Sequence, residues 1–313
     1  MVMKNFLKNE IKNTKQLFKI LNISQQTLSA EQRNSLNDKG FVIIPPTTYI
    51  LKNLKKLNKI SEELIKIEGS KGGWEGKEKH YVVGKFFENG ANRLGNLIDK
   101  HEVFRDLILI PEILAASYEV IKSDIKVGGV DLRNPLKDLG HQAIHIDWMP
   151  RERKSDPFIG VVCFIYLDDS NINNGAVRIV PRSHKKLGWP DEHVDIFKFH
   201  KDEIRMIAPA GTIVVMNLNL WHAGTKNISG EPRKTLFIDI RSRDQSQLLN
   251  FKKYLKTKTK KELNVLQSYL LGVRECDKTQ KEDSIGPGEI YRKRFGNKRG
   301  DFQKKIIESI EYI

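Results

Sequence analysis

Cysteine is scarce in this sequence, with only Cys163 and Cys276 among 313 residues. So few thiols exclude the class of small secreted domains that disulfides hold together, and they favour a reducing compartment. Long apolar runs are lacking as well: no stretch approaches the roughly 18 consecutive apolar residues of a membrane span, and the opening residues lack the apolar centre of a signal peptide. We therefore expect a cytoplasmic protein that makes no membrane contact.

Acidic residues are too few to balance the basic ones, which leaves a formal net charge of +15. A basic field attracts nucleic acids and small anions alike. However, 38 of the 54 basic residues are lysines spread along the whole chain, and no basic cluster is interleaved with aromatic residues as in single-strand binders. The charge therefore does not favour a nucleic-acid partner, and it leaves an anionic small-molecule substrate open.

Internal repeats and clean linkers are also absent, so we predict one domain over residues 1–313. Its core, 125–243, consists of short apolar runs separated by Gly, Asn, Asp and Pro, a pattern typical of a β-sandwich or barrel. The flanking parts are a helical extension over 1–28, a mostly helical flank over 29–124 and a basic helical extension over 244–313. Strands are expected at 40–44, 125–132, 144–148, 158–167, 177–180, 204–208, 212–216 and 235–240.

The clearest sequence patterns for helices lie before residue 125, on the N-terminal side of this core. Leu and Ile recur at spacings of three and four over 50–67, which predicts an amphipathic helix. A second helical pattern covers 103–122, and Pro111 is expected to break it or to open its second half. Ser29, followed by Gln32 three residues later, has the pattern of a capping box at a helix start.

A candidate metal site begins with His145 and Asp147, which lie two residues apart on the predicted strand 144–148. Alternate residues of a strand point the same way, so both side chains would emerge on one face. His222 follows the strand 212–216, and Arg233 comes eleven residues after it. Two His and one carboxylate leave three adjacent positions of an iron ion open. A nearby arginine can anchor the far carboxylate of a 2-oxo diacid through its planar fork.

Three further segments give this pattern a family resemblance. They are Gly40–Ile44 after a helix, the turn NGAVRIVPRSHK at 174–185, and HAGTKNISGEPR at 222–233. Over about residues 29–243 the chain resembles the phytanoyl-CoA dioxygenase-like family of Fe(II)- and 2-oxoglutarate-dependent oxygenases. The resemblance implies a mainly β fold with flanking helices, whose core is a double-stranded β-helix of the jelly-roll, cupin-like kind.

The resemblance also implies a site and a reaction. Iron would be held by His145, Asp147 and His222, and the co-substrate 2-oxoglutarate by Arg233. With O2, 2-oxoglutarate would be converted to succinate and CO2 while an unactivated C–H bond of a small-molecule metabolite is hydroxylated. Desaturation and ring closure stay open. Halogenation is disfavoured, because related halogenases replace the carboxylate ligand with a small residue, whereas this chain has Asp147.

Other residues of the site are less defined. Gln142 and Thr225 are candidates for further co-substrate contacts, and Gly224 stands where some family members have a serine. The turn at 174–185 has Arg182 in place of the usual glycine. For the substrate the candidates are Trp148, although a tryptophan in this position is more often a packing residue, and two arginines that would either receive an anionic substrate at the mouth or lie solvated on the surface, Arg151 and Arg241.

Two other classes of function fit the same residues. Because these ligands accept several divalent ions, a jelly-roll metalloenzyme of another class, such as an isomerase, is one alternative, although it gives Arg233 no role. A non-catalytic jelly roll that binds an acidic partner is the other, and it leaves the intact metal triad unexplained. Hydroxylation of a protein or nucleic acid is a variant of the main prediction. Neither the identity of the substrate nor the oligomeric state follows from the sequence.

Overall fold

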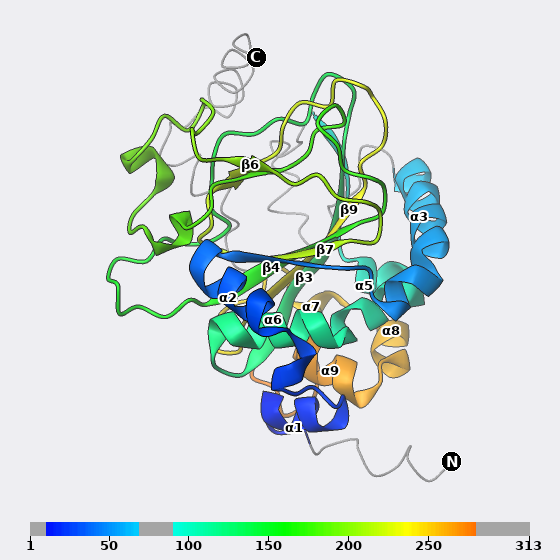
Figure 1. Cartoon of the computed structure of the whole chain (residues 1–313). Helices are drawn as coiled ribbons and strands as arrows, with labels where there is room; N and C mark the ends of the chain where they lie inside the picture. The colour runs from blue at the N-terminus through cyan, green and yellow to red at the C-terminus, as the bar shows by residue number, and fades with distance from the viewer. Residues whose placement is uncertain (1–10, 69–89, 280–313) are drawn as a thin grey trace.

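The strands of the protein form two facing sheets in the computed structural model, which describes residues 11–68 and 90–279. The large sheet has the strand order β1-β7-β4-β9-β3-β2 and the small sheet β6-β5-β8, and every strand pair is antiparallel. Together they make the predicted jelly roll, seen in Figure 1 with β6 across from β4 and β7. The strands are β1 Phe41–Ile44, β2 Ala91–Leu94, β3 Ile125–Pro135, β4 Gly160–Tyr166, β5 Arg178–Ile179, β6 Ile204–Arg205, β7 Ile213–Asn217, β8 His222–Ala223 and β9 Thr235–Ser242.

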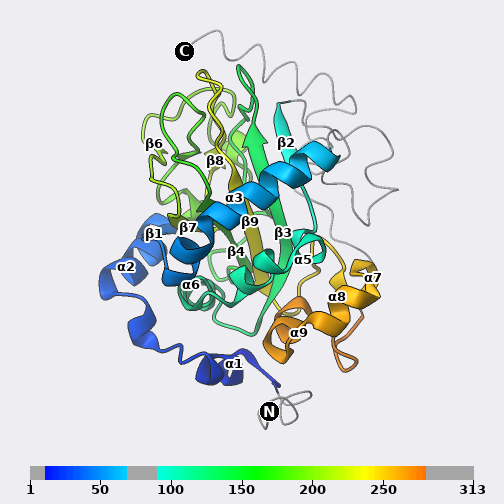
Figure 2. The same ribbon diagram turned by 90° about the vertical axis from the view of Figure 1, so that its right-hand side faces the viewer.

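Helices cover the outer face of the large sheet. In Figure 1, α2, α6 and α9 lie below its strands, and Figure 2 shows α3 in front of β3 and β9. The predicted helix 50–67 is confirmed as α3, the capping box of Ser29 and Gln32 opens α2, and Pro111 begins α6. The helices are α1 Thr14–Ile20, α2 Ala30–Lys39, α3 Thr48–Glu68, α5 Leu97–Lys100, α6 Pro111–Ile121, α7 Phe251–Tyr254, α8 Thr257–Glu262 and α9 Val265–Leu271, with 3-10 turns η2 Gln25–Thr27, η4 Glu102–Phe104, η5 Asp106–Leu109, η6 Ser183–Lys185 and η7 Pro190–Glu192.

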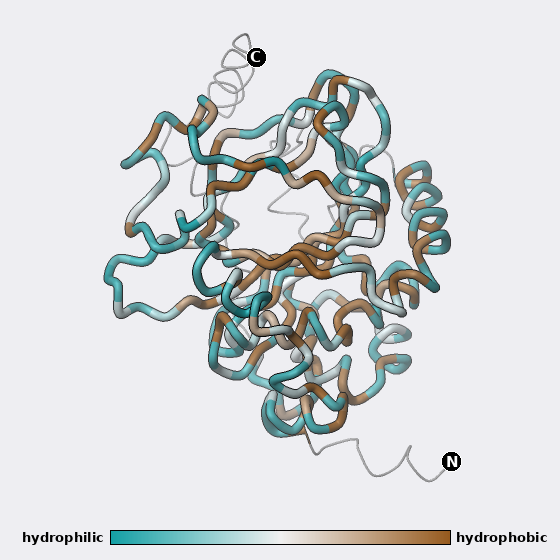
Figure 3. The backbone as a smooth tube through the Cα atoms, viewed as in Figure 1, coloured by the Kyte–Doolittle hydropathy of each residue, from teal (hydrophilic) through white to brown (hydrophobic). Residues whose placement is uncertain are grey.

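Strand β4 shows how the sequence builds two cores from one sheet. Cys163 and Ile165 pack against the helices, whereas the alternating Phe164 and Tyr166 pack towards the small sheet. Because both faces are buried, the strand is apolar throughout instead of alternating with polar residues. Figure 3 shows the hydrophobic segments gathered along these strands. Burial raises the pKa of the Cys163 thiol, so this cysteine stays protonated within the core.

Some of the predicted strands are wrong in detail. The segment 144–148 forms no regular strand, and only His145 makes a bridge, to His222. Its neighbours hydrogen-bond to other segments instead: the Ile144 N–H donates to Ile196 O at 2.8 Å and the Asp147 N–H to Leu218 O at 2.8 Å. The short strands β2 and β8 were not predicted. Residues 280–313 of the predicted basic helical extension lie outside the described residues.

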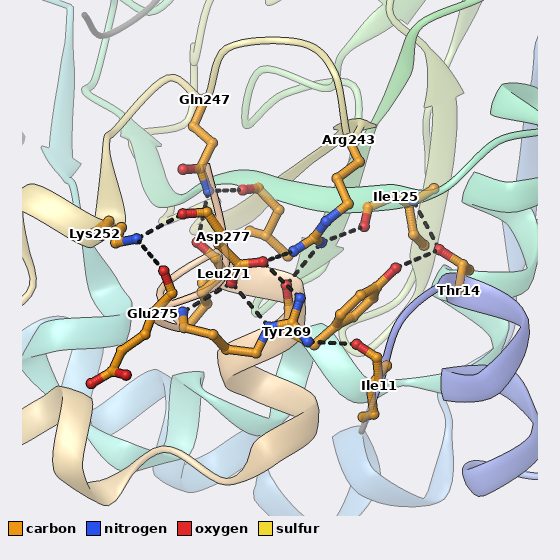
Figure 4. A network of polar contacts seen from close by, with 12 residues as sticks. Ile11, Thr14, Ile125, Arg243, Gln247, Lys252, Tyr269, Leu271, Glu275 and Asp277 are labelled. Carbon is orange, nitrogen blue, oxygen red and sulfur yellow. Dashed lines mark hydrogen bonds and ion pairs between the residues drawn. The ribbon is translucent and has the colours of Figure 1, made fainter. Parts of the chain in front are cut away.

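A polar network fastens the first described residues and the last helices to β3 and β9 (Figure 4). Asp277 accepts a hydrogen bond from Arg243 Nη2 at 2.7 Å and from Arg274 Nη2 at 2.7 Å. Arg243 Nη1 also donates to the carbonyl of Tyr269 at 2.9 Å, and the Tyr269 hydroxyl lies 3.2 Å from Thr14 Oγ1. The network therefore depends on one carboxylate between two guanidinium groups.

Asp277 should make the stability of the protein depend on pH. Burial alone would raise the pKa of Asp277, but the hydrogen bonds and charges of Arg274 and Arg243 outweigh it and hold the pKa below its usual value. A carboxyl whose pKa is lowered by folding contributes stability above its unfolded pKa, and this contribution is lost as pH falls through the folded pKa.

We therefore expect Asp277→Asn to lower the melting temperature at about pH 7. The deficit relative to the wild type should begin to shrink below about pH 4, the pKa of the unfolded carboxyl, and should disappear as the pH falls through the lower pKa of the folded one. Thermal unfolding followed by circular dichroism across this range measures both effects. A deficit of the same size at every pH would contradict the electrostatic account.

Gly40 lies between α2 and β1, in a position that does not accommodate a larger residue. Its φ of 88° is in the left-handed region, and a Cβ there would lie 2.4 Å from His184 Nδ1 and 2.8 Å from Leu220 Cδ1. We expect Gly40→Ala to cost about 2–4 kcal/mol of unfolding free energy, from backbone strain together with overpacking. Chemical denaturation measures this cost.

Gly272→Ala is the matched control for Gly40. Gly272 also has a positive φ, 64°, but the nearest atoms to an added Cβ belong to Gln247 at 4.0 Å. Only the backbone strain then applies, so the cost should be about 1–2 kcal/mol. Equal losses of unfolding free energy at both positions would show that the contact with His184 does not contribute to the cost of Gly40→Ala.

Candidate metal centre

Two histidines face each other across neighbouring segments of the chain. The N–H of His145 donates to the carbonyl of His222 at 3.0 Å, and the N–H of His222 donates back at 3.1 Å. His222 belongs to β8, which pairs with β5 of the small sheet. This reciprocal pair holds the two imidazole rings with their centroids 4.3 Å apart.

The hydrogen bonds of the two rings decide which nitrogen is available. Nδ1 of His145 lies 2.8 Å from the carbonyl of Ala143, and Nδ1 of His222 lies 2.9 Å from the carbonyl of Leu220. A carbonyl only accepts, so each Nδ1 carries the proton and each Nε2 keeps its lone pair. Such backbone acceptors orient metal-binding histidines in many proteins.

Both Nε2 atoms point to the same carboxylate. Asp147 Oδ1 lies 3.9 Å from Nε2 of His145, and Oδ2 lies 3.4 Å from Nε2 of His222. One ligand atom from each of the three residues falls within 4.8 Å of the others, so they could hold a metal ion. Burial and the neighbouring His222 lower the pKa of His145 to about 4, so this imidazole is neutral at physiological pH, as a metal ligand must be. The donor set therefore fits a 2-His-1-carboxylate centre.

The three residues lie on the wall of a cavity of about 170 Å³ between the two sheets. Arg233 lies on the same wall and is completely buried. Its Nη1 donates to Thr235 Oγ1 at 3.0 Å, and its backbone N–H donates to Asn134 Oδ1 at 2.9 Å. The apolar part of the lining consists of Val162 and Phe164 on β4, Val177 just before β5, Phe237 on β9, and Leu248.

The two candidates for further co-substrate contacts differ in position. Gln142 lines the cavity, and its Oε1 accepts the N–H of Gly224 at 3.0 Å. Thr225 does not line it, because its hydroxyl donates to the carbonyl of Ala176 at 2.7 Å. The structure therefore brings Gln142 to the site and turns Thr225 towards β5.

None of the three substrate candidates, Trp148, Arg151 and Arg241, lines the cavity. Arg241 is neither at an exposed mouth nor solvated, which corrects the expectation from sequence. It is fully buried, forms a two-pronged ion pair with Asp239 and stacks 3.9 Å above the Trp148 ring. Arg151 stacks over Phe158 and donates to a backbone carbonyl of its own loop at 3.0 Å. Trp148 and Arg241 therefore support the cavity wall from behind through Asp239.

The cavity contains charged residues that the sequence analysis missed. Asp131 and Arg133 on β3, Asp239 on β9 and Arg93 on β2 all line it. A partial signal was present, since Asp131 lies in the predicted strand 125–132 and Arg133 directly after it, and their spacing of two places both on the face opposite the helix-packed one. Charged residues at two successive inward positions of a core strand are costly unless they have a partner or a ligand.

The two departures from the family pattern have visible consequences. Arg182 has a φ of 68°, the left-handed conformation that favours the usual glycine. Its side chain forms an ion pair with Asp38 at 2.6 Å. At Gly224 a Cβ would lie 2.7 Å from the carbonyl oxygen of Gly140 and 3.0 Å from Gln142 Oε1, so the local packing leaves no room for a serine.

A family model described as Phytanoyl-CoA dioxygenase (PhyH) matches residues 36–235, well over half of the chain. The chain belongs to the phytanoyl-CoA dioxygenase family. Its members are iron- and 2-oxoglutarate-dependent oxygenases, so the predicted cofactor set of Fe(II), 2-oxoglutarate and O2 is confirmed at the level of the family.

Solved structures share the fold of this phytanoyl-CoA dioxygenase family member at low identity. The non-heme alpha ketoglutarate dependent carbocyclase SnoK from nogalamycin biosynthesis is 18% identical with a TM-score of 0.53, over 71% of this chain and 87% of that one. HygX from Streptomyces hygroscopicus with nickel and 2-oxoglutarate bound is 15% identical with a TM-score of 0.55, over 71% and 90%. A further HygX structure, 14% identical with a TM-score of 0.55 and the same coverage, also holds hygromycin B.

A membrane span was not expected from the sequence. Among residues 11–68 and 90–279, no helix combines the length with the apolar character that crossing a bilayer requires.

Proposed function

We propose that this family member is a hydroxylase that inserts oxygen into an unactivated C–H bond of a small-molecule metabolite. The observation that carries the proposal is the convergence of two Nε2 atoms and one carboxylate on the wall of a cavity that also contains the buried Arg233. In this proposal His145, Asp147 and His222 hold Fe(II). When bound, the metal would supply the redox chemistry that couples 2-oxoglutarate and O2 to succinate, CO2 and the hydroxylated product.

The chain's own residues prepare the site for this chemistry. The carbonyls of Ala143 and Leu220 fix both imidazole rings, so the ligand atoms face Asp147 before any metal binds. Arg233 offers a fixed, buried cation for the far carboxylate of 2-oxoglutarate. Phe164 and Phe237 make the opposite wall apolar, which keeps water from the reacting atoms and presents no easily oxidised group.

A small substrate is supported by the volume of the cavity, which is about 170 Å³. Hygromycin B bound to HygX shows that the shared fold can receive a small molecule. We assign the reaction to the cytoplasm, where Fe(II) and the exposed thiol of Cys276 stay reduced. An anionic substrate stays a prediction.

The proposal is tested by mixing anaerobically purified protein with Fe(II) and 2-oxoglutarate and then admitting O2. We expect a visible metal-to-ligand charge-transfer band before O2 and iron-dependent succinate after it. Mass spectrometry in a metabolite screen should then find a product that has gained one oxygen atom. A product that has lost two hydrogen atoms would replace hydroxylation by desaturation or ring closure. Absence of both the band and succinate would favour another metalloenzyme class or a binding module.

A further inference from the structure

The three candidate metal ligands have little regular secondary structure to hold them in place. His145 and His222 pair through an isolated β-bridge, and β8 is only two residues long. Asp147 lies in a segment that forms no strand. A ligand set has to be held within about 0.5 Å of its productive geometry by side chains that packing fixes in turn. A single bridge therefore leaves most of this positioning to side-chain packing.

A small apolar cluster lies directly behind the ligands. Ile144 and Ile146 flank His145, and Ile146 also separates this residue from the carboxylate ligand, while Trp221 comes directly before His222. Alternate residues of an extended chain point to opposite sides. Accordingly, within the described part of the chain, the cavity lining includes the three ligands and none of these neighbours. The neighbours pack together in what we call the backing cluster, which consists of the buried residues Ala143, Ile144, Ile146, Val180, Trp189, Ile196 and Trp221.

Trp221 connects the segment of His222 to the rest of the backing cluster. Its backbone N–H donates to Ser183 Oγ at 2.8 Å, and its carbonyl accepts the N–H of Val180 at 2.9 Å. Its side chain is buried in the cluster. Because both the main chain and the side chain of Trp221 are fixed, the backbone of His222 has little freedom to move.

The segment between β5 and β6 completes the backing cluster from outside. Ile196 packs in the cluster, and its carbonyl accepts the N–H of Ile144 at 2.8 Å. The far end of the segment is fixed by an ion pair between Glu203 and the buried Arg178, with an N···O distance of 2.9 Å. None of residues 180–203, all of which the structure describes, lines the cavity. This segment therefore reaches the ligands only through their sequence neighbours.

We propose that Trp221 is a positioning residue for the metal centre and acts through the backing cluster. Without its indole ring the cluster would contain a void, into which the surrounding side chains relax in part. Because Ile144 and Ile146 flank His145, such a relaxation displaces the ligand atoms although no ligand is changed. Loss of an outer residue that orients metal ligands typically lowers metal affinity 10–100-fold. The inference rests on the proposed function, in which the three ligands hold Fe(II).

The test is anaerobic titration of Fe(II) into the full-length protein in competition with a coloured chelator. We expect Trp221→Leu to weaken Fe(II) binding about 10- to 100-fold, and Trp221→Phe, which keeps a smaller ring, to weaken it less. Ile196→Ala should weaken binding as well, although it leaves the carbonyl that Ile144 uses in place. At saturating Fe(II), the charge-transfer band with 2-oxoglutarate should shift in wavelength in Trp221→Leu, because the band depends on ligand geometry and not on overall stability.

Phe104→Leu is the matched control. Phe104, in η4, is fully buried in the larger core on the helix side of the large sheet. Its substitution should lower the melting temperature as well, but should change the Fe(II) affinity less than about twofold and leave the band in place. A loss of Fe(II) affinity equal to that of Trp221→Leu would overturn the inference, since the effect would then follow from stability alone.

The remaining outcomes separate this inference from the proposed function. Unchanged Fe(II) affinity in Trp221→Leu and Ile196→Ala, with the wild type binding Fe(II) normally, would overturn the positioning role and leave the proposed function intact. If the wild type itself binds no Fe(II), the proposed function fails, and this inference with it.

Discussion

Replacing His222 with alanine is expected to abolish iron-dependent succinate formation. His222 offers one of three converging ligand atoms, and its Nε2 lies 3.4 Å from Asp147. Loss of a residue that only orients a ligand typically costs 10–100-fold in metal affinity, so loss of the ligand itself should cost at least about 100-fold. Iron content after desalting and succinate formation measure the two consequences separately.

Structural damage must be distinguished from ligand loss in this variant. The pairing of His222 with His145 runs through the main chain, so it survives the substitution. His222→Gln, which keeps a similar volume, should lose iron to a similar degree while its melting temperature stays close to that of the wild type. His193→Ala removes an exposed histidine outside the cluster and should leave iron content and succinate unchanged. Full iron content in His222→Ala would rule out the assignment of the ligands.

The metal triad could be predicted from the sequence because its signal is local. Asp147 follows His145 by two residues, and both side chains reach the same point although only one of them lies in a bridge. His222 could be placed because a recognisable apolar strand precedes it. The strand pattern of 158–167 and the break at Pro111 are local in the same sense, and the structure confirms both.

Properties that depend on contacts between distant segments were not predictable. Arg241 is charged and follows the predicted strand 235–240, so a solvated position was a reasonable prediction, but Arg241 lies within β9 and is completely buried beside Asp239 and Trp148. Thr225 follows the distal histidine closely, yet its hydroxyl donates to the carbonyl of Ala176, just before β5. Strand β8 is two residues long and pairs with a partner more than forty residues earlier. A strand this short has no periodicity for a sequence pattern to reveal.

The two sheets contribute differently to the protein: the large sheet carries most of the packing against the helices, and the small sheet carries His222 of the candidate metal site. The large sheet is packed against the helices on its outer face and supplies Arg133 and Asp239 from its inner face. The small sheet has short strands, and His222 lies on one of them, beside the irregular segment that carries His145. Substitutions at the triad should therefore change activity much more than stability, because few core contacts depend on these side chains.

Replacing Arg233 with methionine is expected to raise the KM for 2-oxoglutarate at least about 100-fold, equivalent to about 3 kcal/mol of binding energy. Arg233 is fully buried, and its backbone is fixed by Asn134, so its guanidinium is positioned before the co-substrate arrives. If the interaction is the same in the ground and transition states, kcat at saturating 2-oxoglutarate should change little. Initial rates of succinate formation over a range of 2-oxoglutarate concentrations measure both constants.

The selectivity between co-substrates gives the sharper test of Arg233. The wild type should strongly prefer 2-oxoglutarate over 2-oxopentanoate, because only the former has the carboxylate that the guanidinium would bind. In Arg233→Met this preference should fall, whereas Arg233→Lys should keep part of it, since the ammonium retains the charge without the fork. Arg93→Met, which removes a charge from an exposed part of the same cavity, should retain the full preference. An unchanged preference in Arg233→Met would show that the far carboxylate is bound elsewhere.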